Sequence, residues 1–178
     1  VLPCLPKNLR AVKSTALDSA LKKIKIPAKP QESARSVAPQ LNQDQQAAVD
    51  AITAEGGYKP YLLFGVTGSG KTEVYLRSAE KILERERQHG RRAQVLILVP
   101  EINLTPQLEN SVRARFPSLH VVSLHSQLAE GERTRSWLSA HMGNASIVLG
   151  TRLAVLASVP DLKLIVVDEE HDPSYKQQ

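Results

Sequence analysis

Short apolar runs recur along most of the chain at lengths that suit buried strands. Each run is four to six residues long and mostly apolar, with at most one polar or charged residue inside it. Runs of this kind, bounded by turn residues, are typical of strands that are covered on both faces. The pattern therefore predicts about five strands, within the segments 61–66 (YLLFGV), 94–100 (QVLILVP), 120–126 (HVVSLHS), 146–151 (SIVLGT) and 162–170 (LKLIVVDEE).

Between these runs the apolar residues recur every three to four positions, which is the period of an amphipathic helix. Asn42 is a suitable N-cap for the first such segment, and Pro106 is tolerated only in the first turn of a later one. Strands that alternate with helices indicate an α/β fold, with a parallel sheet covered by helices on both faces. The predicted helical segments are 41–53, 71–88, 103–116, 130–142 and a short turn at 152–158.

The first 40 residues follow neither pattern. Prolines at positions 27, 30 and 39 lie among polar residues, and only residues 14–24 have the spacing of a short amphipathic helix. This segment carries eight Lys and Arg against two acidic residues, a net charge of +6, whereas the remainder of the chain has −1. We expect residues 1–40 to be a basic linker, although a basic arm that contacts nucleic acid phosphates is an open alternative. Residues 41–178 then form the folded domain.

Composition limits the class of protein. A length of 178 residues, with 42% apolar and 23% charged residues, suits one soluble globular domain. The single cysteine excludes an internal disulfide framework, and no apolar run approaches the roughly 18 residues of a membrane helix. Because the chain lacks an initiator Met and a leader sequence, we expect it to be a piece of a larger protein that is not secreted.

The segment GVTGSGKT matches the pattern of a phosphate-binding P-loop. Glycines let successive backbone N–H groups face the phosphates, and the helix that follows adds its positive N-terminal end. We expect Lys71 to reach the β and γ phosphates and Thr72 to supply a hydroxyl to Mg²⁺. The predicted nucleotide-binding residues of this loop are Gly65, Gly68, Ser69, Gly70, Lys71 and Thr72.

Two adjacent carboxylates follow the last apolar run, at Asp168 and Glu169. Carboxylates at the end of a buried strand are unfavourable unless a cation or hydrogen bonds compensate them. Downstream of a P-loop, Asp168 is the predicted magnesium-organising and nucleotide-binding residue, and Glu169 is the predicted base that polarises the attacking water. We assign Lys71, Asp168 and Glu169 as catalytic. An Asp–Glu pair suits hydrolysis by water, hence a machine driven by a nucleoside triphosphate.

The P-loop and the box Asp168-Glu169-Glu170-His171 together resemble the superfamily 2 helicases. The closer resemblance is to the primosomal protein N′ family of replication-restart helicases, and it runs from about Leu41 to Gln178. It rests on LLFGVTGSGKTEVYL, LVPEINLTPQ, LHSQLAEGER, IVLGTRLAVLAS and LIVVDEEHDPSYKQQ, in that order. The resemblance implies a RecA-like P-loop lobe, the first of two helicase lobes. It places residues 1–40 at the end of a preceding DNA-binding region.

The resemblance also implies roles for individual residues. Gln45 stands where such helicases read the adenine base; the alternative is a polar residue on a helix face. Residues of the family's motifs Ia and Ib line the path of single-stranded DNA, and hydroxyls, amides and an Arg suit a phosphate backbone. For Arg152 the alternative is a surface salt bridge. The DNA-binding residues implied are Pro100, Glu101, Thr105, Gln107, Thr151 and Arg152.

By resemblance, the chain is the ATP-binding lobe of an ATP-dependent 3′ to 5′ DNA helicase that assembles the primosome at stalled forks in the bacterial cytoplasm. ATP and Mg²⁺ are its implied cofactors. Single-stranded and forked DNA, single-stranded-DNA-binding protein and other primosome proteins are its implied partners, with no membrane. Two other functions stay open. One is an ATP-gated DNA or protein scaffold without productive unwinding, and the other is a different superfamily 2 translocase.

In this family an aromatic-rich loop and a second RecA-like lobe follow, and the second lobe carries an arginine finger and a zinc-binding insertion. We expect zinc only in that missing part, and we expect the chain alone to hydrolyse ATP poorly.

Overall fold

The computed structural model describes residues 6, 22, 39–66 and 68–176. The described chain divides into two compact units. The helical unit lies within Val37–Arg92, and the sheet unit lies within Ala93–Gln178. The predicted linker at 1–40 and the predicted helix at 14–24 fall almost entirely outside the described residues.

The helical unit contains α3 (Gln43–Thr53) and α4 (Lys71–Gln88). The predicted N-cap of α3 is confirmed: the Asn42 side chain accepts a hydrogen bond from the Gln45 backbone N–H at 2.8 Å. The Gln45 side chain returns the interaction to the Asn42 N–H at 3.0 Å, which completes a capping box. The sequence thus fixes the start of α3 by two reciprocal bonds.

The two helices of this unit pack together along their lengths. Lys81 on α4 pairs with Asp50 on α3 at 2.8 Å, and the Arg85 guanidinium donates to the Thr53 carbonyl at 2.8 Å. The periodic apolar residues of α4, among them Val74, Ala79 and Ile82, are buried, as predicted. No helix among the described residues is both long and apolar enough to cross a membrane.

The predicted strand at 61–66 is wrong. The described residues there have no regular secondary structure, and Leu62, Phe64 and Val66 are 76%, 92% and 78% exposed. A strand needs a neighbour to receive its backbone hydrogen bonds. The described part of the helical unit offers two helices and no other extended segment that could pair with it.

The sheet unit is built on four parallel strands in the order β2-β3-β1-β4. Four of the five predicted strands are therefore confirmed. Their ends lie within two residues of the expected limits, except that the last strand ends at Val167, three residues before its expected limit. Parallel pairing joins Val95 to Ile147 between β1 and β3, and Val121 to the same residue between β2 and β3. The strands are β1 (Gln94–Leu98), β2 (Val121–Leu124), β3 (Ile147–Gly150) and β4 (Leu162–Val167).

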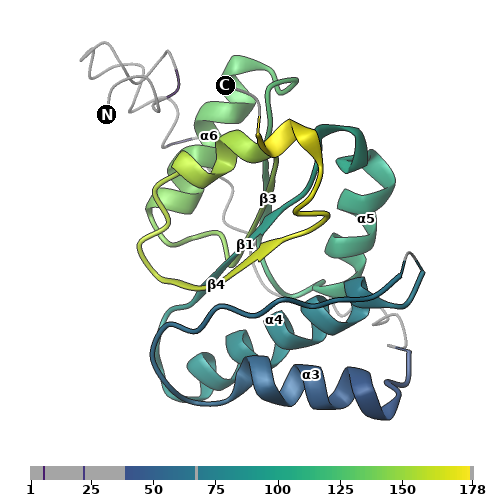
Figure 1. Cartoon of the computed structure of the whole chain (residues 1–178). Coiled ribbons are helices and arrows are strands. Elements are labelled where there is room, and N and C mark those ends of the chain that lie inside the picture. The colour runs from purple at the N-terminus through teal and green to yellow at the C-terminus, as the bar shows by residue number, and fades with distance from the viewer. Residues whose placement is uncertain (1–5, 7–21, 23–38, 67, 177–178) are drawn as a thin grey trace. The chain divides into compact units, whose positions relative to one another are not determined.

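Helices connect the strands, as a parallel sheet requires. The helix α5 (Pro106–Arg115) joins β1 to β2, and α6 (Glu130–His141) joins β2 to β3. The two helices lie on opposite sides of the sheet (Figure 1), which follows when right-handed crossovers run in opposite directions along it. Pro106 is the first residue of α5, as predicted. Three short 3₁₀ helices follow strand ends or turns: η2 (Glu101–Asn103), η3 (Arg152–Leu156) and η4 (Pro173–Tyr175).

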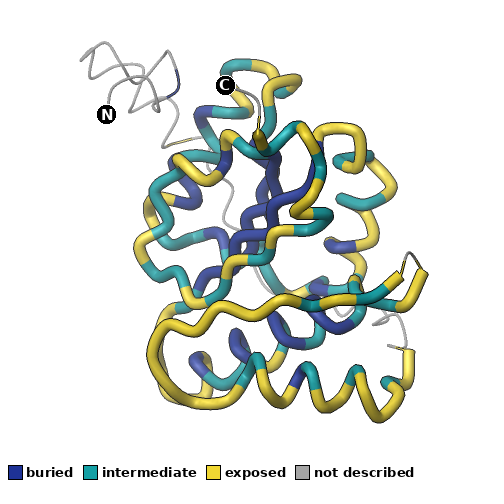
Figure 2. Tube along the Cα trace, in the orientation of Figure 1, coloured by how far each residue is buried: buried dark blue, intermediate teal, exposed yellow. Residues whose placement is uncertain are grey.

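The core of the sheet unit centres on β1, β2 and β3, whose residues are all buried (Figure 2). The strand β4 differs, because its residues alternate between half-buried and exposed. Ile165 and Val167 are 48% and 45% exposed although both are apolar. Within the described residues, β4 is one of the two outermost strands, at the opposite edge from β2, and pairs only with β1.

Gln94 is the one fully buried polar residue that begins a central strand of the described sheet. Its side-chain amide donates to the carbonyls of Ala140 and Ala145 at 2.9 and 2.8 Å, and its side-chain oxygen accepts from the Asp161 N–H at 3.1 Å. The side chain therefore ties the end of α6, the turn before β3 and the turn before β4 to the start of β1.

Replacing Gln94 with Met is expected to lower the free energy of unfolding by about 3 kcal/mol or more, because three backbone groups, two of them buried, each lose a hydrogen bond. Chemical denaturation of the purified chain measures this. The matched control is Gln88→Met, since Gln88 is exposed and donates one side-chain bond to Glu84. The control is expected to change stability by about 0.5 kcal/mol at most. Equal effects of the two variants would contradict the role assigned to Gln94.

Candidate functional site

The glycine-rich loop of the helical unit has the backbone that its sequence requires. Gly68 and Gly70 have φ of 80° and 82°, a left-handed conformation that glycine adopts without steric cost. Gly70 is also the N-cap of α4, and no side chain caps that helix end. The first turn of this 18-residue helix therefore presents backbone N–H groups that can donate hydrogen bonds to an anion. This arrangement fits a phosphate group.

Lys71 turns back over this loop. Its ammonium group donates to the carbonyl oxygens of Gly65 and Val66 at 2.6 and 3.1 Å. Both acceptors are neutral, and a phosphate oxygen is a stronger acceptor for an ammonium group because it is charged. These two carbonyl oxygens therefore hold the Lys71 amine beside the glycine turn. An anion bound at that turn would lie within its reach.

Gln45 contacts the same loop, since its side-chain amide donates to the Ser69 carbonyl at 3.0 Å. Its other end serves the capping box of α3. The predicted adenine contact remains a prediction, but Gln45 is more than a polar residue on a helix face. A Cβ on Gly70 would lie 2.5 Å from the Gln45 side-chain nitrogen, so this close contact needs glycine there.

Each unit carries one of the two predicted magnesium-binding residues. In the helical unit, Thr72 is the exposed second residue of α4, and in the sheet unit Asp168 offers a carboxylate. Oxygen donors of this kind suit Mg²⁺, which proteins commonly bind through one or two side chains plus substrate phosphates. Within the described parts of the chain, no group of three or more His, Cys, Asp or Glu residues could hold a metal ion. The binding of Mg²⁺ by Thr72 and Asp168 together with nucleotide phosphates stays a prediction.

In the sheet unit, the predicted site residues follow the carboxyl ends of parallel strands. Pro100 and Glu101 follow β1, Thr151 and Arg152 follow β3, and the acidic pair at 168–169 follows β4. Parallel strands end at one edge of a sheet, and open α/β folds bind ligands at that edge. The structure thus places these predicted residues on a common edge.

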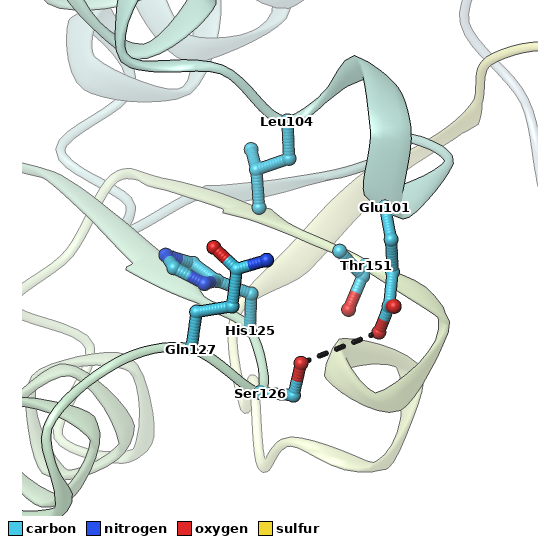
Figure 3. Close-up of a pocket in the computed structure, with 6 residues that line it drawn as sticks. All are labelled: Glu101, Leu104, His125, Ser126, Gln127 and Thr151. Carbon is cyan, nitrogen blue, oxygen red and sulfur yellow. Dashed lines mark hydrogen bonds between the residues drawn. The ribbon is translucent and has the colours of Figure 1, made fainter.

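A small pocket of about 10 Å³, the room of one water molecule, lies at this edge. The Thr151 side chain is buried, and its hydroxyl has no hydrogen-bond partner among the described residues. Figure 3 shows the Ser126 hydroxyl reaching toward the Glu101 carboxylate, to which it donates at 3.4 Å. The pocket is lined by Glu101, Leu104, His125, Ser126, Gln127 and Thr151.

Thr151 owes its position to a close approach of two chain segments. A Cβ on Gly150 would lie 2.6 Å from the Leu124 carbonyl oxygen, so only glycine fits at the end of β3. The Thr151 N–H donates to that same carbonyl at 3.2 Å. Glycine at this position therefore brings the end of β3 against the end of β2.

The other predicted DNA-side residues divide by environment. Pro100 is buried and begins the turn into η2, so it shapes the loop. The Thr105 hydroxyl accepts the Leu108 N–H at 3.2 Å as the N-cap of α5. Gln107 is exposed in the first turn of that helix. Of these three side chains, Gln107 is the one presented to solvent.

The two acidic residues occupy a tight turn after β4. Asp168 still belongs to the ladder, since its N–H donates to the Leu98 carbonyl at 2.8 Å. Glu169 then has φ of 50°, a left-handed conformation that is unusual for a residue with a side chain. Its carboxylate lies 3.4 Å from the His171 ring nitrogen. Strained backbone of this kind concentrates at functional sites.

Tyr175 packs behind this turn. Its hydroxyl donates to the Asp168 carbonyl at 3.0 Å. The pKa of the Tyr175 hydroxyl is raised to about 12. Burial is the largest cause, and the negative charges of Asp168, Asp172 and Glu169 add to it. The hydroxyl therefore remains a protonated donor at neutral pH.

Sequence reasoning assigned no role to His125, Ser126, Gln127 or Tyr175. The first three follow β2 directly, and a rule that every strand end of a parallel sheet contributes to the edge would have selected them. Tyr175 carries no such signal, because its contact with Asp168 arises only when residues 169–174 fold back.

Comparison with known proteins identifies the family. The family model described as DEAD/DEAH box helicase matches residues 42–178. Replication restart protein PriA of Synechocystis is 41% identical over 177 residues, which are 99% of this chain and 20% of that protein. Its counterparts in Haemophilus influenzae and Bacillus subtilis are 44% and 42% identical over 78% of this chain and 18% and 17% of their own lengths.

The chain therefore spans about a fifth of the length of these relatives. The match of the family model covers most of the chain, and the four-stranded parallel sheet flanked by helices agrees with a RecA-like lobe. The predicted resemblance is confirmed. The chain belongs to the DEAD/DEAH box helicase family, and within it the chain is similar to replication restart protein PriA.

Proposed function

We propose that this chain is the ATP-binding lobe of an ATP-dependent 3′ to 5′ DNA helicase that acts in replication restart. The observation that carries the proposal is the glycine loop. Its left-handed glycines, the helix end without a side-chain cap and the overlying Lys71 amine together fit a nucleotide phosphate. Family membership and the names of the relatives support the assignment to restart.

A few residues of this chain would carry out ATP hydrolysis, each with a separate role. Lys71 neutralises the phosphates, and the glycine-loop N–H groups orient them. Thr72 and Asp168 would hold Mg²⁺, which supplies charge stabilisation to the phosphoryl group when it is bound. Glu169 accepts a proton from the attacking water. Gln45, beside the loop, is the proposed contact for the adenine base.

The DNA strand would pass along the carboxyl edge of the sheet. Arg152 supplies a positive charge there, and Gln107 and the Thr151 hydroxyl supply polar contacts to the sugar–phosphate backbone. Glu101, Thr105 and Pro100 shape this edge. The contacts need no base recognition, which suits a motor that acts on any sequence.

The proposed partners of the whole protein are single-stranded and forked DNA, single-stranded-DNA-binding protein and other primosome proteins, in the bacterial cytoplasm. Any zinc is proposed for the part of the protein outside this chain.

Replacing Lys71 with Ala in the full-length protein is expected to lower DNA-stimulated ATP hydrolysis by at least about a hundredfold, because the phosphates lose their main positive contact. Steady-state hydrolysis with and without single-stranded or forked DNA measures this. Lys81→Ala is the matched control, since Lys81 lies on the same helix and pairs only with Asp50 at the surface. If DNA does not change the rate of ATP hydrolysis by the wild-type protein, the helicase assignment is wrong.

The same variant separates the two main candidate functions. If primosome assembly on a model fork persists with Lys71→Ala, the protein is a scaffold whose nucleotide chemistry is dispensable. If assembly and unwinding are both lost, hydrolysis drives the function. A different superfamily 2 translocase would show DNA-stimulated hydrolysis without restart activity.

A further inference from the structure

Two hydrogen bonds connect the DNA-side segment after β3 with the acidic turn after β4. The Arg152 guanidinium donates to the Ser174 carbonyl at 3.0 Å. The next residue, Tyr175, donates from its hydroxyl to the Asp168 carbonyl at 3.0 Å. Arg152 is the proposed phosphate contact and Asp168 is the proposed magnesium-organising residue, so one short segment touches both.

Two internal hydrogen bonds hold that short segment, η4. The Asp172 side chain accepts the Ser174 N–H at 2.8 Å, and the Tyr175 N–H donates to the Asp172 carbonyl at 3.1 Å. The Tyr175 ring packs against the apolar cluster of the sheet unit, which includes Leu98 and Leu124. A shift of the Ser174 carbonyl is therefore carried to the Tyr175 hydroxyl rather than absorbed between them.

The acidic turn has a reason to need such support. Glu169 is left-handed, and a residue with a Cβ is less stable in that conformation than in the right-handed one. The carbonyl that precedes it belongs to Asp168 and accepts the Tyr175 hydroxyl. This bond orients the peptide group between the two acidic residues, whose N–H, that of Glu169, donates to the Asp168 carboxylate at 3.1 Å.

We propose that Tyr175 is a positioning residue for Asp168 and Glu169, and that the Arg152–Ser174 bond makes this positioning respond to DNA. The inference rests on the proposed function. A phosphate oxygen is a stronger acceptor for a guanidinium group than the neutral Ser174 carbonyl is. DNA that engages Arg152 draws it from that carbonyl, η4 moves, and the acidic turn moves with it.

The first test is Tyr175→Phe in the full-length protein, which removes the hydroxyl and retains the packed ring. The turnover number for DNA-stimulated hydrolysis is expected to fall by about three- to tenfold, as the loss of one neutral hydrogen bond of ordinary strength allows. The KM for ATP and the Kd for single-stranded DNA are expected to change by less than about twofold. Tyr61→Phe is the matched control, because the Tyr61 hydroxyl also donates to a backbone carbonyl, that of Ala51, at 2.8 Å.

The second measurement needs no nucleotide. Amide hydrogen exchange of residues 168–176 is compared with and without a single-stranded oligonucleotide. We expect DNA to change exchange there in the wild type, and we expect this response to be lost in Tyr175→Phe at equal DNA occupancy. In an Arg152→Lys background, Tyr175→Phe is expected to lower turnover less than it does alone, since both changes interrupt one link.

The outcomes separate the link from the proposed function. If the wild type binds DNA and is stimulated by it, but Tyr175→Phe matches the wild type in turnover and in exchange, the link is wrong and the function stands. If the two substitutions lower turnover independently, Tyr175 acts locally and the response through Arg152 is wrong. If the wild type neither binds DNA nor responds to it, both proposals fall.

Discussion

Glu169→Gln in the full-length protein is expected to lower the turnover number for DNA-stimulated ATP hydrolysis by about 10²- to 10⁴-fold, the usual contribution of a general base. The amide has the size of the carboxylate but cannot take a proton from water. Nucleotide affinity is expected to change little, because the lost step belongs to the transition state. Single-turnover hydrolysis together with binding of labelled ATP measures the two effects separately.

The chain supplies a matched control one residue along. Glu170 carries the same charge and lies in the same turn, but it is exposed and has an ordinary backbone conformation. Glu170→Gln is expected to reduce turnover by no more than about threefold, as surface substitutions away from a site usually do. If the two variants were equally impaired, the loss would reflect the charge of the whole turn, and Glu169 would not be the base.

The second large effect concerns the 178-residue chain by itself. It is expected to hydrolyse ATP about 10³-fold or more slowly than the full-length protein with DNA, since an arginine finger commonly contributes 10³ to 10⁵ in rate. The resemblance assigns that arginine to a second lobe. The relatives, of which this chain spans about a fifth, have ample length for one. Steady-state phosphate release by both proteins, under identical conditions, measures the ratio.

A folded sample is the necessary control for this comparison. Cooperative unfolding of the isolated chain, monitored alongside the Gln94→Met variant, would show that its sheet is intact. Clear DNA-stimulated turnover by the folded chain alone would contradict the expectation and would place every group needed for hydrolysis within these residues.

Much of this fold could be predicted from local pattern, because the buried strands and amphipathic helices of the sheet unit follow two distinct periods. Asn42 and Pro106 fixed helix starts for reasons that act within one turn. The segment 61–66 shows where such reasoning fails. Its apolar run has the composition of a strand, but strand formation depends on a neighbouring chain, and the described part of its own unit provides none.

The candidate site divides in the same way. A glycine loop and an Asp–Glu pair are recognisable because their chemistry depends on residues adjacent in sequence. The links made by Arg152 and Tyr175 are not, since each bond joins residues brought together only by the folded turn after β4. Left-handed Glu169 was also beyond prediction, because glycine is the residue usually expected in that conformation.

The outer strand β4 has a consequence for handling the protein. On this strand Ile165 and Val167 are about half exposed, and among the described strands it pairs with β1 alone, so one side of it has no strand partner there. Such an edge is a template for strand addition by another molecule. We therefore expect the isolated chain to self-associate as its concentration rises, so rates and unfolding curves should be measured on it in dilute solution.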